Sequence, residues 1–393
     1  MINPNIKNIS EPPIPLALSW SNSYNGKYGD VIDMSQAVPS YPPHIELQEN
    51  FKNFSSDISL LSYGEIEGEH ILRENYSDHI NKKYSARTSY NDILVTSGCN
   101  QAFIASVICL AETGDEIMIS NPGYFSHELS LKMLNIKPKY FELNSKNKFE
   151  INLDDIEKRI TSKVKAIVLV SPGNPTGSAH DKNKLDKLLD LCVKKNKYLI
   201  IDETYRDFIF PNSGQPHNLF NNNRWRKNLI QLYSFSKSFC IPGHRLGAIT
   251  ADSKLISQIS KVMDNIQICA PRPAQHAVAS FLPKIDKFLT KKCSEIGEKA
   301  KLFSQSLQNF SGWKISSIGT FFAYVNHPYD NIKSDKVAKI LATKCGVVTI
   351  PGIYFGNNQE KFLRMSIAGL SNPQIKSVKN RLEILETYIW FKL

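Results

Sequence analysis

The sequence predicts an α/β protein with a large domain, built on a mostly parallel seven-stranded sheet between helices, and a smaller α+β C-terminal domain. From about residue 90 onward, short apolar runs alternate with longer amphipathic ones. Strands that alternate with helices pair mainly in parallel and are covered on both faces. The last hundred residues follow a different order of strands and helices. A chain of 393 residues with 41% hydrophobic content is also long enough for roughly two or three domains.

The elements of the large domain follow from its apolar runs. Seven runs predict strands, at 92–96, 116–120, 137–143, 164–171, 197–202, 228–234 and 246–251. Residues 99–112 are expected to form a helix after the first strand. Residues 181–195 carry Leu185, Leu188, Leu189 and Cys192 at helical spacing and predict a second helix between two strands.

The C-terminal part predicts strands at 319–327, 347–350 and 361–368, with helices at 334–345 and 372–391. Ser334 is expected to cap the first helix, and Asn372 the second, with Pro373 at its first position. The proline-rich stretch 269–275 indicates a domain boundary. We therefore expect residues 46–270 to form the large domain, and residues 1–45 with 271–393 to form the small one.

Composition and charge exclude several classes of protein. No run of about 18 apolar residues could span a bilayer, and the N-terminus lacks a secretory pattern, so a soluble cytoplasmic protein without membrane contact is expected. The seven cysteines are widely spaced and contain no CxxC pair, which argues against a zinc site or a disulfide framework. The net charge is +11, but the lysines are dispersed and form no basic stripe with interleaved aromatics. A nucleic-acid partner is therefore not expected.

Two residues stand at the ends of predicted strands, where chemistry is often placed. Lys237 follows the strand that ends near Ser234 and lies where α/β sheets hold ligands. Its flanking hydroxyls and Arg245 could hold a phosphate, and a nearby cation would favour the nucleophilic free amine. The competing interpretation is an ordinary surface lysine. Asp202 ends an apolar strand and needs a cationic partner or a capping role, for which a protonated pyridine nitrogen and a helix N-terminus are both open.

Two loops add to this pattern. Ser171–Gly177 contains two prolines and two glycines and leaves Asn174 as its large polar projection, a combination that a generic loop seldom needs. Gly98 and Cys99 stand at the start of a predicted helix, where exposed N–H groups favour an anion. Many turns between a strand and a helix share this second pattern.

In this order, the motifs resemble the fold-type I pyridoxal-phosphate-dependent aminotransferases of class I/II, the aspartate-aminotransferase-like type. The resemblance runs from about Asp33 to Ala368. Its core motifs are Ser171–Gly177, Asp202 with Tyr205, Ser234-x-Ser236-Lys237, and Gly243–Gly247.

The resemblance implies pyridoxal 5'-phosphate as cofactor, held as a Schiff base by Lys237, which also moves the substrate proton. Asp202 would pair with the pyridine nitrogen and keep it protonated. Asn174 and Tyr205 would hydrogen-bond the phenolic oxygen of the ring, and Tyr124 would stack on its face. Lys237, Asp202 and Tyr205 are thus the expected catalytic residues.

It also implies how the phosphate and the substrate are held. The phosphate would be surrounded by Gly98, Cys99, Ser234, Ser236 and Arg245. Tyr63 resembles the tyrosine that reaches the phosphate of the neighbouring subunit, which implies a homodimer with shared active sites. Arg364 matches the arginine that binds the substrate α-carboxylate, for which its planar fork is suited. Asn174 is expected to contact the substrate as well.

The chain departs from the family pattern at three positions. Ala37 stands where relatives commonly carry a glycine beside the substrate carboxylate, so the pocket around this substrate-binding position is expected to differ. Cys99 replaces a second small residue, which is tolerable where its N–H alone is used. His244 precedes Arg245 where an aromatic is common, and either packing or titration near the phosphate could explain it.

The resemblance implies transfer of an amino group between an amino acid and a 2-oxo acid. Fold and cofactor do not settle the reaction, so a lyase, a decarboxylase or a cyclase of secondary metabolism is the alternative. A regulator of this fold would carry a DNA-binding domain, and only about 30 residues precede the matched region. Arg272 could read an acidic substrate side chain or simply begin a helix.

Overall fold

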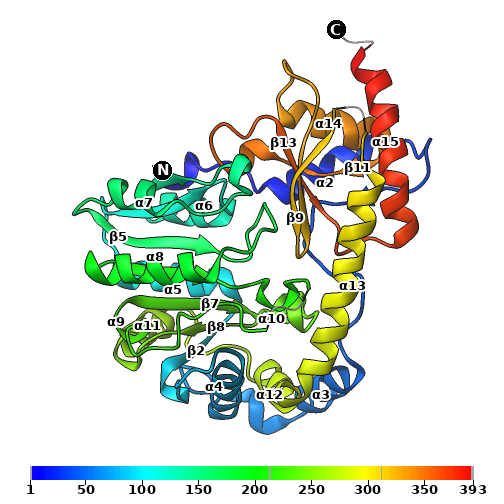
Figure 1. Ribbon diagram of the computed structural model, residues 1–393. Coiled ribbons are helices and arrows are strands. Elements are labelled where there is room, and N and C mark those ends of the chain that lie inside the picture. Colours follow the sequence, from blue (N-terminus) through cyan, green and yellow to red (C-terminus); the bar gives the residue numbers. More distant parts are fainter. Residues whose placement is uncertain (1, 212–213, 311, 391–393) are drawn as a thin grey trace.

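The computed structural model describes residues 2–211, 214–310 and 312–390, and within them one sheet has seven strands in the order β2-β8-β7-β6-β5-β3-β4 (Figure 1). Its strands are β2 (Ile93–Thr96), β3 (Glu116–Asn121), β4 (Lys137–Glu142), β5 (Val164–Val170), β6 (Tyr198–Asp202), β7 (Leu229–Ser234) and β8 (Gly247–Thr250). Strand β8 runs antiparallel to both of its neighbours, and the other pairs are parallel. This confirms the predicted mostly parallel sheet.

Helices cover both faces of this sheet, because alternate residues of its strands enter two different cores. In β6, Leu199 and Ile201 pack in one core and Ile200 packs in the other. The first core includes side chains of α4 (His70–Tyr84), α7 (Leu153–Arg159), α8 (Lys182–Lys194) and α12 (Arg272–Phe281). The second includes side chains of α5 (Cys99–Leu110), α6 (Phe125–Met133) and α11 (Ser253–Ile266). Burial on both faces explains why strands such as β2, β5 and β7 appear in the sequence as apolar runs rather than as alternating patterns.

A smaller antiparallel sheet has the order β12-β13-β10-β9. Its strands are β9 (Lys314–Gly319), β10 (Phe322–Asn326), β12 (Ile350–Pro351) and β13 (Phe362–Ser366). A separate parallel pair joins β1 (Ile32–Asp33) to β11 (Val347–Val348). Side chains of α13 (Ile285–Ser306), α14 (Ser334–Cys345) and α15 (Asn372–Trp390) share one apolar core with these strands. The predicted smaller α+β unit is therefore present.

The remaining helices are α1 (Pro4–Lys7), α2 (Pro13–Trp20), α3 (Ile45–Ser55), α9 (Trp225–Asn228) and α10 (Phe235–Ser238). Figure 1 shows α13 running along the side of the molecule, from α3 and α12 at one end to the small sheet at the other. Helix α12 packs on α3 and α4. The expected domain limits at residues 45 and 270 stay a prediction. Within the described ranges, no helix combines the length and the apolar character needed to cross a bilayer.

Several details of the C-terminal elements differ from the sequence expectation. Residues 347–350 do not form one strand, because Thr349 separates β11 from β12 and these two lie in different sheets. Strand β9 was not predicted.

The two expected helix caps are wrong by one residue. Ser334 and Asn372 are the first residues of α14 and α15 rather than their caps. The Ser334 hydroxyl instead accepts a hydrogen bond from Ile353 N at 3.3 Å. At α15, Gln374 N donates to Ser371 Oγ at 3.4 Å, and Gln374 Oε1 accepts from Ser371 N at 2.9 Å. This reciprocal pair is a capping box on Ser371. The last residue predicted for this helix, Phe391, lies outside the described residues.

Candidate active site

One edge of the seven-stranded sheet collects the predicted functional residues. The carboxyl ends of β2, β3, β5, β6 and β7 meet there, and β8 begins there because it runs the opposite way. The residues at or just after these strand ends, or just before β8, include Gly98, Cys99, Tyr124, Asn174, Asp202, Tyr205, Ser236, Lys237 and Arg245. This is the edge where open α/β sheets bind ligands.

A cavity of about 840 Å³, open to solvent, lies at this edge. Ten of the predicted cofactor and substrate residues line it together with Ala37: Cys99, Tyr124, Asn174, Asp202, Tyr205, Ser234, Ser236, Lys237, Arg245 and Arg364. Other lining residues are Ile14, Gln36, Val38, Asn100, Val170, Thr204 and Pro242. Residues that are far apart in the sequence, from 14 to 364, therefore meet in one site.

Lys237 lies on the one-turn helix α10, and its side chain is half-buried beside the cavity. Burial lowers the pKa of its amine to about 8, with help from the positive charges of Arg364 and Arg245. A larger fraction of this amine is therefore unprotonated near neutral pH than for an ordinary lysine. Such an amine is a nucleophile suited to a carbonyl group.

Asp202 is buried at the end of β6 and carries hydrogen bonds on both oxygens. His127 Nε2 lies 3.3 Å from its Oδ2, and Thr204 donates to Oδ1 from N at 3.0 Å and from Oγ1 at 2.7 Å. Burial raises the pKa of Asp202, but the hydrogen bond and charge of His127, together with Thr204, outweigh burial and lower it. The carboxylate is therefore held ionised inside the cavity, where it suits a cationic partner.

His127 and Thr204 were missed by the sequence reasoning. His127 lies on α6, three residues after Tyr124, and its ring meets the Tyr124 ring edge-on at 5.3 Å. A histidine one helical turn after a predicted site residue was a signal that could have been used. Thr204 is an ordinary turn residue in the sequence, and its role depends on where Asp202 lies.

Arg364 is buried on β13 of the small sheet and reaches into the same cavity. Its Nη1 donates to Asn174 Oδ1 at 3.0 Å and its Nη2 donates to Ser35 O, while its Nε has no hydrogen-bond partner among the described residues. The aromatic rings of Phe322 and Phe355 lie 4.8 and 5.3 Å from the guanidinium. Burial lowers the pKa of Arg364 to about 10. A buried guanidinium with neutral hydrogen-bond partners is a position for an anionic ligand.

A second anion position lies at the start of α5. Gly98 has φ 89°, precedes the helix, and leaves its N-terminus without a side-chain cap in the described chain. A Cβ at this glycine would collide with the Arg245 guanidinium, whose Nη1 is held by Pro242 O at 2.9 Å. Close approach of Arg245 to a helix N-terminus suits a phosphate. The hydroxyl-bearing residues Ser234 and Ser236 line the same cavity.

The structure shows the surroundings of the three residues that depart from the family pattern. Ala37 is buried and lines the cavity next to the loop whose Ser35 O accepts from Arg364. Burial raises the pKa of the Cys99 thiol well above its ordinary value, so this residue stays neutral. The His244 ring stacks on Phe51 at 3.7 Å, which favours packing as its role.

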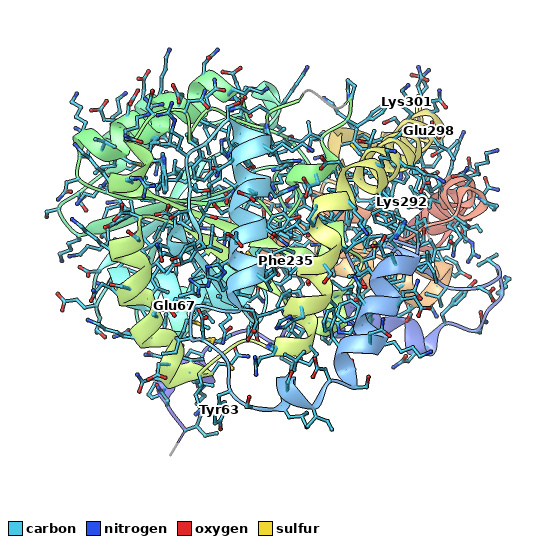
Figure 2. All side chains as sticks on the ribbon, turned by 90° about the horizontal axis from the view of Figure 1, so that it is seen from below. Tyr63, Glu67, Phe235, Lys292, Glu298 and Lys301 are labelled. Atoms are coloured by element: carbon cyan, nitrogen blue, oxygen red, sulfur yellow. The ribbon has the colours of Figure 1, made fainter. Side chains whose placement is uncertain are left out.

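Tyr63 does not line the cavity of its own chain. Its side chain is 78% exposed, and it lies at the margin of the molecule (Figure 2). Arg272 begins α12, and its guanidinium contacts Glu69 Oε1 at 2.7 Å and Oε2 at 3.3 Å. It also donates to the carbonyl of Ser62 at 3.2 Å. Arg272 therefore braces the loop that carries Tyr63, which favours its structural interpretation.

Comparison with known proteins agrees with this geometry. The family model for aminotransferase class I and II matches residues 29–382. An aspartate aminotransferase of Sulfolobus acidocaldarius is 26% identical over 366 residues, covering 90% of each chain. An aromatic aminotransferase of Arabidopsis thaliana is 25% identical and covers 89% of this chain and 88% of its own.

Solved structures show the same fold. A double mutant of Thermus thermophilus aspartate aminotransferase superposes with a TM-score of 0.89 at 19% identity, over 98% of this chain and 99% of the other. An aromatic aminotransferase from Pyrococcus horikoshii gives 0.85 at 24% identity, over 94% and 99%. The family match favours transamination over the lyase, decarboxylase, cyclase and regulator alternatives. The chain belongs to the class I and II aminotransferases and is an aminotransferase enzyme.

Proposed function

We propose that the protein uses pyridoxal 5'-phosphate, bound through Lys237, to transfer an amino group between an amino acid and a 2-oxo acid. The observation that carries this proposal is a single cavity that holds a lysine of lowered pKa, an ionised buried aspartate and two anion positions. The lysine suits an aldehyde and the aspartate suits a ring nitrogen, while the two anion positions suit a phosphate and a carboxylate. When bound, the cofactor supplies the electron sink that allows a bond at the substrate α-carbon to break.

The residues present fit this cofactor. Asp202, fixed by His127 and Thr204, would hold the ring nitrogen in its protonated form. Asn174, Tyr205 and Tyr124 line the cavity. Asn174 and Tyr205 would hydrogen-bond the ring oxygen, and Tyr124 would stack on the ring face. Gly98, Cys99, Ser234, Ser236 and Arg245 would hold the phosphate at the start of α5.

The substrate is held by residues of both sheets. Arg364 comes from the small sheet and is oriented by Asn174, which follows β5 of the large sheet. A substrate carboxylate would take the unpaired Nε edge of the guanidinium. Once its amine is free, Lys237 would take the proton from the substrate α-carbon and return it to a second carbon nearby. Such a transfer requires a single base of moderate pKa. Arg364 thus orients the substrate while Lys237 moves the proton.

We also propose that the protein works as a homodimer with shared active sites. The segment 58–63 exposes Ile58 at 81%, Leu61 at 76% and Tyr63 at 78%, and large apolar side chains gathered on one surface often mark an interface. Tyr63 would complete the phosphate site of the partner subunit. A cytoplasmic location is proposed as well, because the seven cysteines of the described chain carry free thiols.

The cofactor proposal is tested by incubating purified protein with pyridoxal phosphate, reducing with borohydride and locating the modified peptide by mass. We expect one adduct at Lys237 and none in Lys237→Ala. Adducts spread over surface lysines, or absent, would contradict the proposal. A panel of amino acids with one 2-oxo acid then identifies the reaction: equal amounts of new amino acid and new oxo acid mark transamination, whereas ammonia or CO₂ marks another outcome.

Shared sites are tested by mixing two inactive variants, Lys237→Ala and Tyr63→Ala, under conditions that exchange subunits. Half of the dimers would be hybrids, and one of the two sites in each hybrid would be intact. About a quarter of wild-type activity is therefore expected. A mixture that remains inactive, although hybrids are shown to form, would exclude this arrangement.

A further inference from the structure

Residues 202–207, at the end of β6 and in the turn that follows it, place their side chains in two different surroundings. Asp202 and Tyr205 line the cavity, whereas Glu203, Arg206 and Asp207 are buried but do not line it. Charged groups are rarely buried without a partner, because their loss of hydration is costly. Three such groups within five residues therefore need an explanation beyond packing.

Arg206 is at the centre of this buried group. Its guanidinium lies 3.9 Å from the ring centre of Tyr233 and 5.6 and 5.5 Å from those of Tyr76 and Tyr84. Carboxylate oxygens of Glu203 and Asp207 lie 3.9 and 3.8 Å away. The aromatic faces and the two carboxylates together stabilise the buried cation.

Asp207 connects this buried group to other segments of the chain. Its Oδ1 pairs with Lys83 Nζ of α4 at 2.7 Å. Its Oδ2 accepts hydrogen bonds from Tyr233 OH at 2.8 Å and from Ser238 Oγ at 2.7 Å. Burial would raise the pKa of Asp207, but Lys83 and Arg206 hold it well below its usual value. The carboxylate is therefore charged and accepts strong hydrogen bonds.

The two hydroxyl donors bracket the segment that carries Lys237. Tyr233 immediately precedes Ser234, and Ser238 immediately follows Lys237. Helix α10 has only four residues, Phe235–Ser238, and a single turn is not stable without outside contacts. Phe235, which begins it, lies in the middle of the molecule in Figure 2 and packs on Tyr76 of α4 at 5.4 Å. Asp207 thus joins the turn of Asp202 and Tyr205 to the turn of Lys237.

We propose that Asp207 is a positioning residue that holds Lys237 at a fixed place relative to Asp202, through its hydrogen bonds to Ser238 and Tyr233. The inference rests on the proposed attachment of the cofactor at Lys237. Asp202 and Lys237 would hold opposite sides of one rigid ring, so their separation must be constant. Asp207 lies five residues from Asp202 along the chain and in contact with the neighbour of Lys237, and it can set that separation.

The test compares Asp207→Asn with a matched control, Asp92→Asn. Asp92 is also buried and ion-paired, to Arg226 at 2.7 Å, but it precedes β2 and therefore lies at the opposite edge of the sheet from the cavity. Both variants are expected to lose stability in urea. Only Asp207→Asn is expected to lower the fraction of cofactor that borohydride fixes to Lys237. It should also raise the pyridoxal-phosphate concentration for half-saturation roughly tenfold to a hundredfold, as expected for a reactive group displaced by about 1 Å.

A kinetic comparison separates positioning from loss of structure. Asp207→Asn should lower kcat and leave the KM for the amino acid unchanged, because Arg364 and Asn174 are untouched. Ser238→Ala removes one hydroxyl donor and introduces no uncompensated charge, so it serves if Asp207→Asn does not fold. We expect Ser238→Ala to show the same split between kcat and KM, with a smaller decrease in covalent attachment.

Three outcomes separate the proposed function from the positioning role of Asp207. Wild-type protein that takes no cofactor at Lys237 would contradict the proposed function itself, before any variant is compared. Wild-type attachment together with equal attachment and kcat in Asp207→Asn and Asp92→Asn would overturn the positioning role alone. Ser238→Ala indistinguishable from wild type in attachment and kcat would overturn it as well.

Discussion

Replacing Arg364 with glutamine should nearly abolish activity while leaving the protein at least as stable. The guanidinium is buried on β13, and no carboxylate of the described residues forms an ion pair with it. Its hydrogen bonds go to Asn174 Oδ1 and Ser35 O, which are neutral. The site therefore maintains a buried positive charge whose partner would be the substrate.

The effect on stability follows from the burial and the hydrogen bonds of the guanidinium. Burial lowers the pKa of Arg364 from its ordinary value to about 10, which corresponds to a cost of about 3 kcal/mol for the charged folded state. Because the folded-state pKa is lowered for a cation, this cost is present at all pH values below about 10. Glutamine removes the charge but also two hydrogen bonds of about 1 kcal/mol each. We expect a change in unfolding free energy between zero and about 2 kcal/mol in favour of the folded state.

The loss of activity should be much larger. Truncating one partner of a buried charge pair costs about 2–5 kcal/mol, which corresponds to roughly 30- to 5,000-fold in kcat/KM. The assay measures kcat/KM for amino-acid donors and the urea unfolding of cofactor-free protein. Arg381→Gln is the control, because Arg381 is another buried arginine, donates to Tyr24 OH at 2.8 Å and Cys345 O at 2.6 Å, and does not line the cavity. The control should keep its kcat/KM. Arg364→Gln with kcat/KM near wild type, or with a clear loss of stability, would contradict this role of Arg364.

Three further outcomes are expected. The rate at which cofactor-free protein takes up pyridoxal phosphate should rise with pH to a plateau just above about 8, the pKa of Lys237, because the free amine is the nucleophile. A rise that continues towards pH 10.5 would contradict the lowered pKa. His127→Asn removes a charge and hydrogen bond that lower the pKa of Asp202, so the acid-side fall in kcat/KM should move to higher pH, and an unchanged profile would exclude this role. Gly98→Ala places a Cβ against the Arg245 guanidinium at a φ of 89°, a backbone cost of about 1–2 kcal/mol. It should weaken cofactor binding roughly tenfold by titration, whereas Gly114→Ala, at φ 93° in open space, should not weaken it.

From the sequence by itself, the seven strands of the large sheet and its mostly parallel character could be predicted, and so could a set of candidate site residues that meet in one cavity. Strands such as β2, β6 and β7 are buried on both faces and therefore produce continuous apolar runs that could be found along the chain. Asn174 and Lys237 follow the ends of such runs and Asp202 lies at the end of one, but their expected roles came from the resemblance to a known family. Constrained loops such as Ser171–Gly177 added specificity, because two prolines and two glycines within seven residues are seldom needed for a simple turn.

The groups that form hydrogen bonds and ion pairs with these residues could be identified only in the folded chain. His127 is an ordinary residue in the sequence, and it matters because folding brings it to the Asp202 carboxylate. Likewise, Asp207 is separated by 31 residues from Ser238, the residue whose hydroxyl it binds. The division of residues 347–350 between two sheets could not be predicted either. Periodicity reports which face of a strand is buried but not which strand pairs with it. Hydrogen bonds and ion pairs between distant segments depend on distances of a few ångströms, and only the packed chain sets those distances.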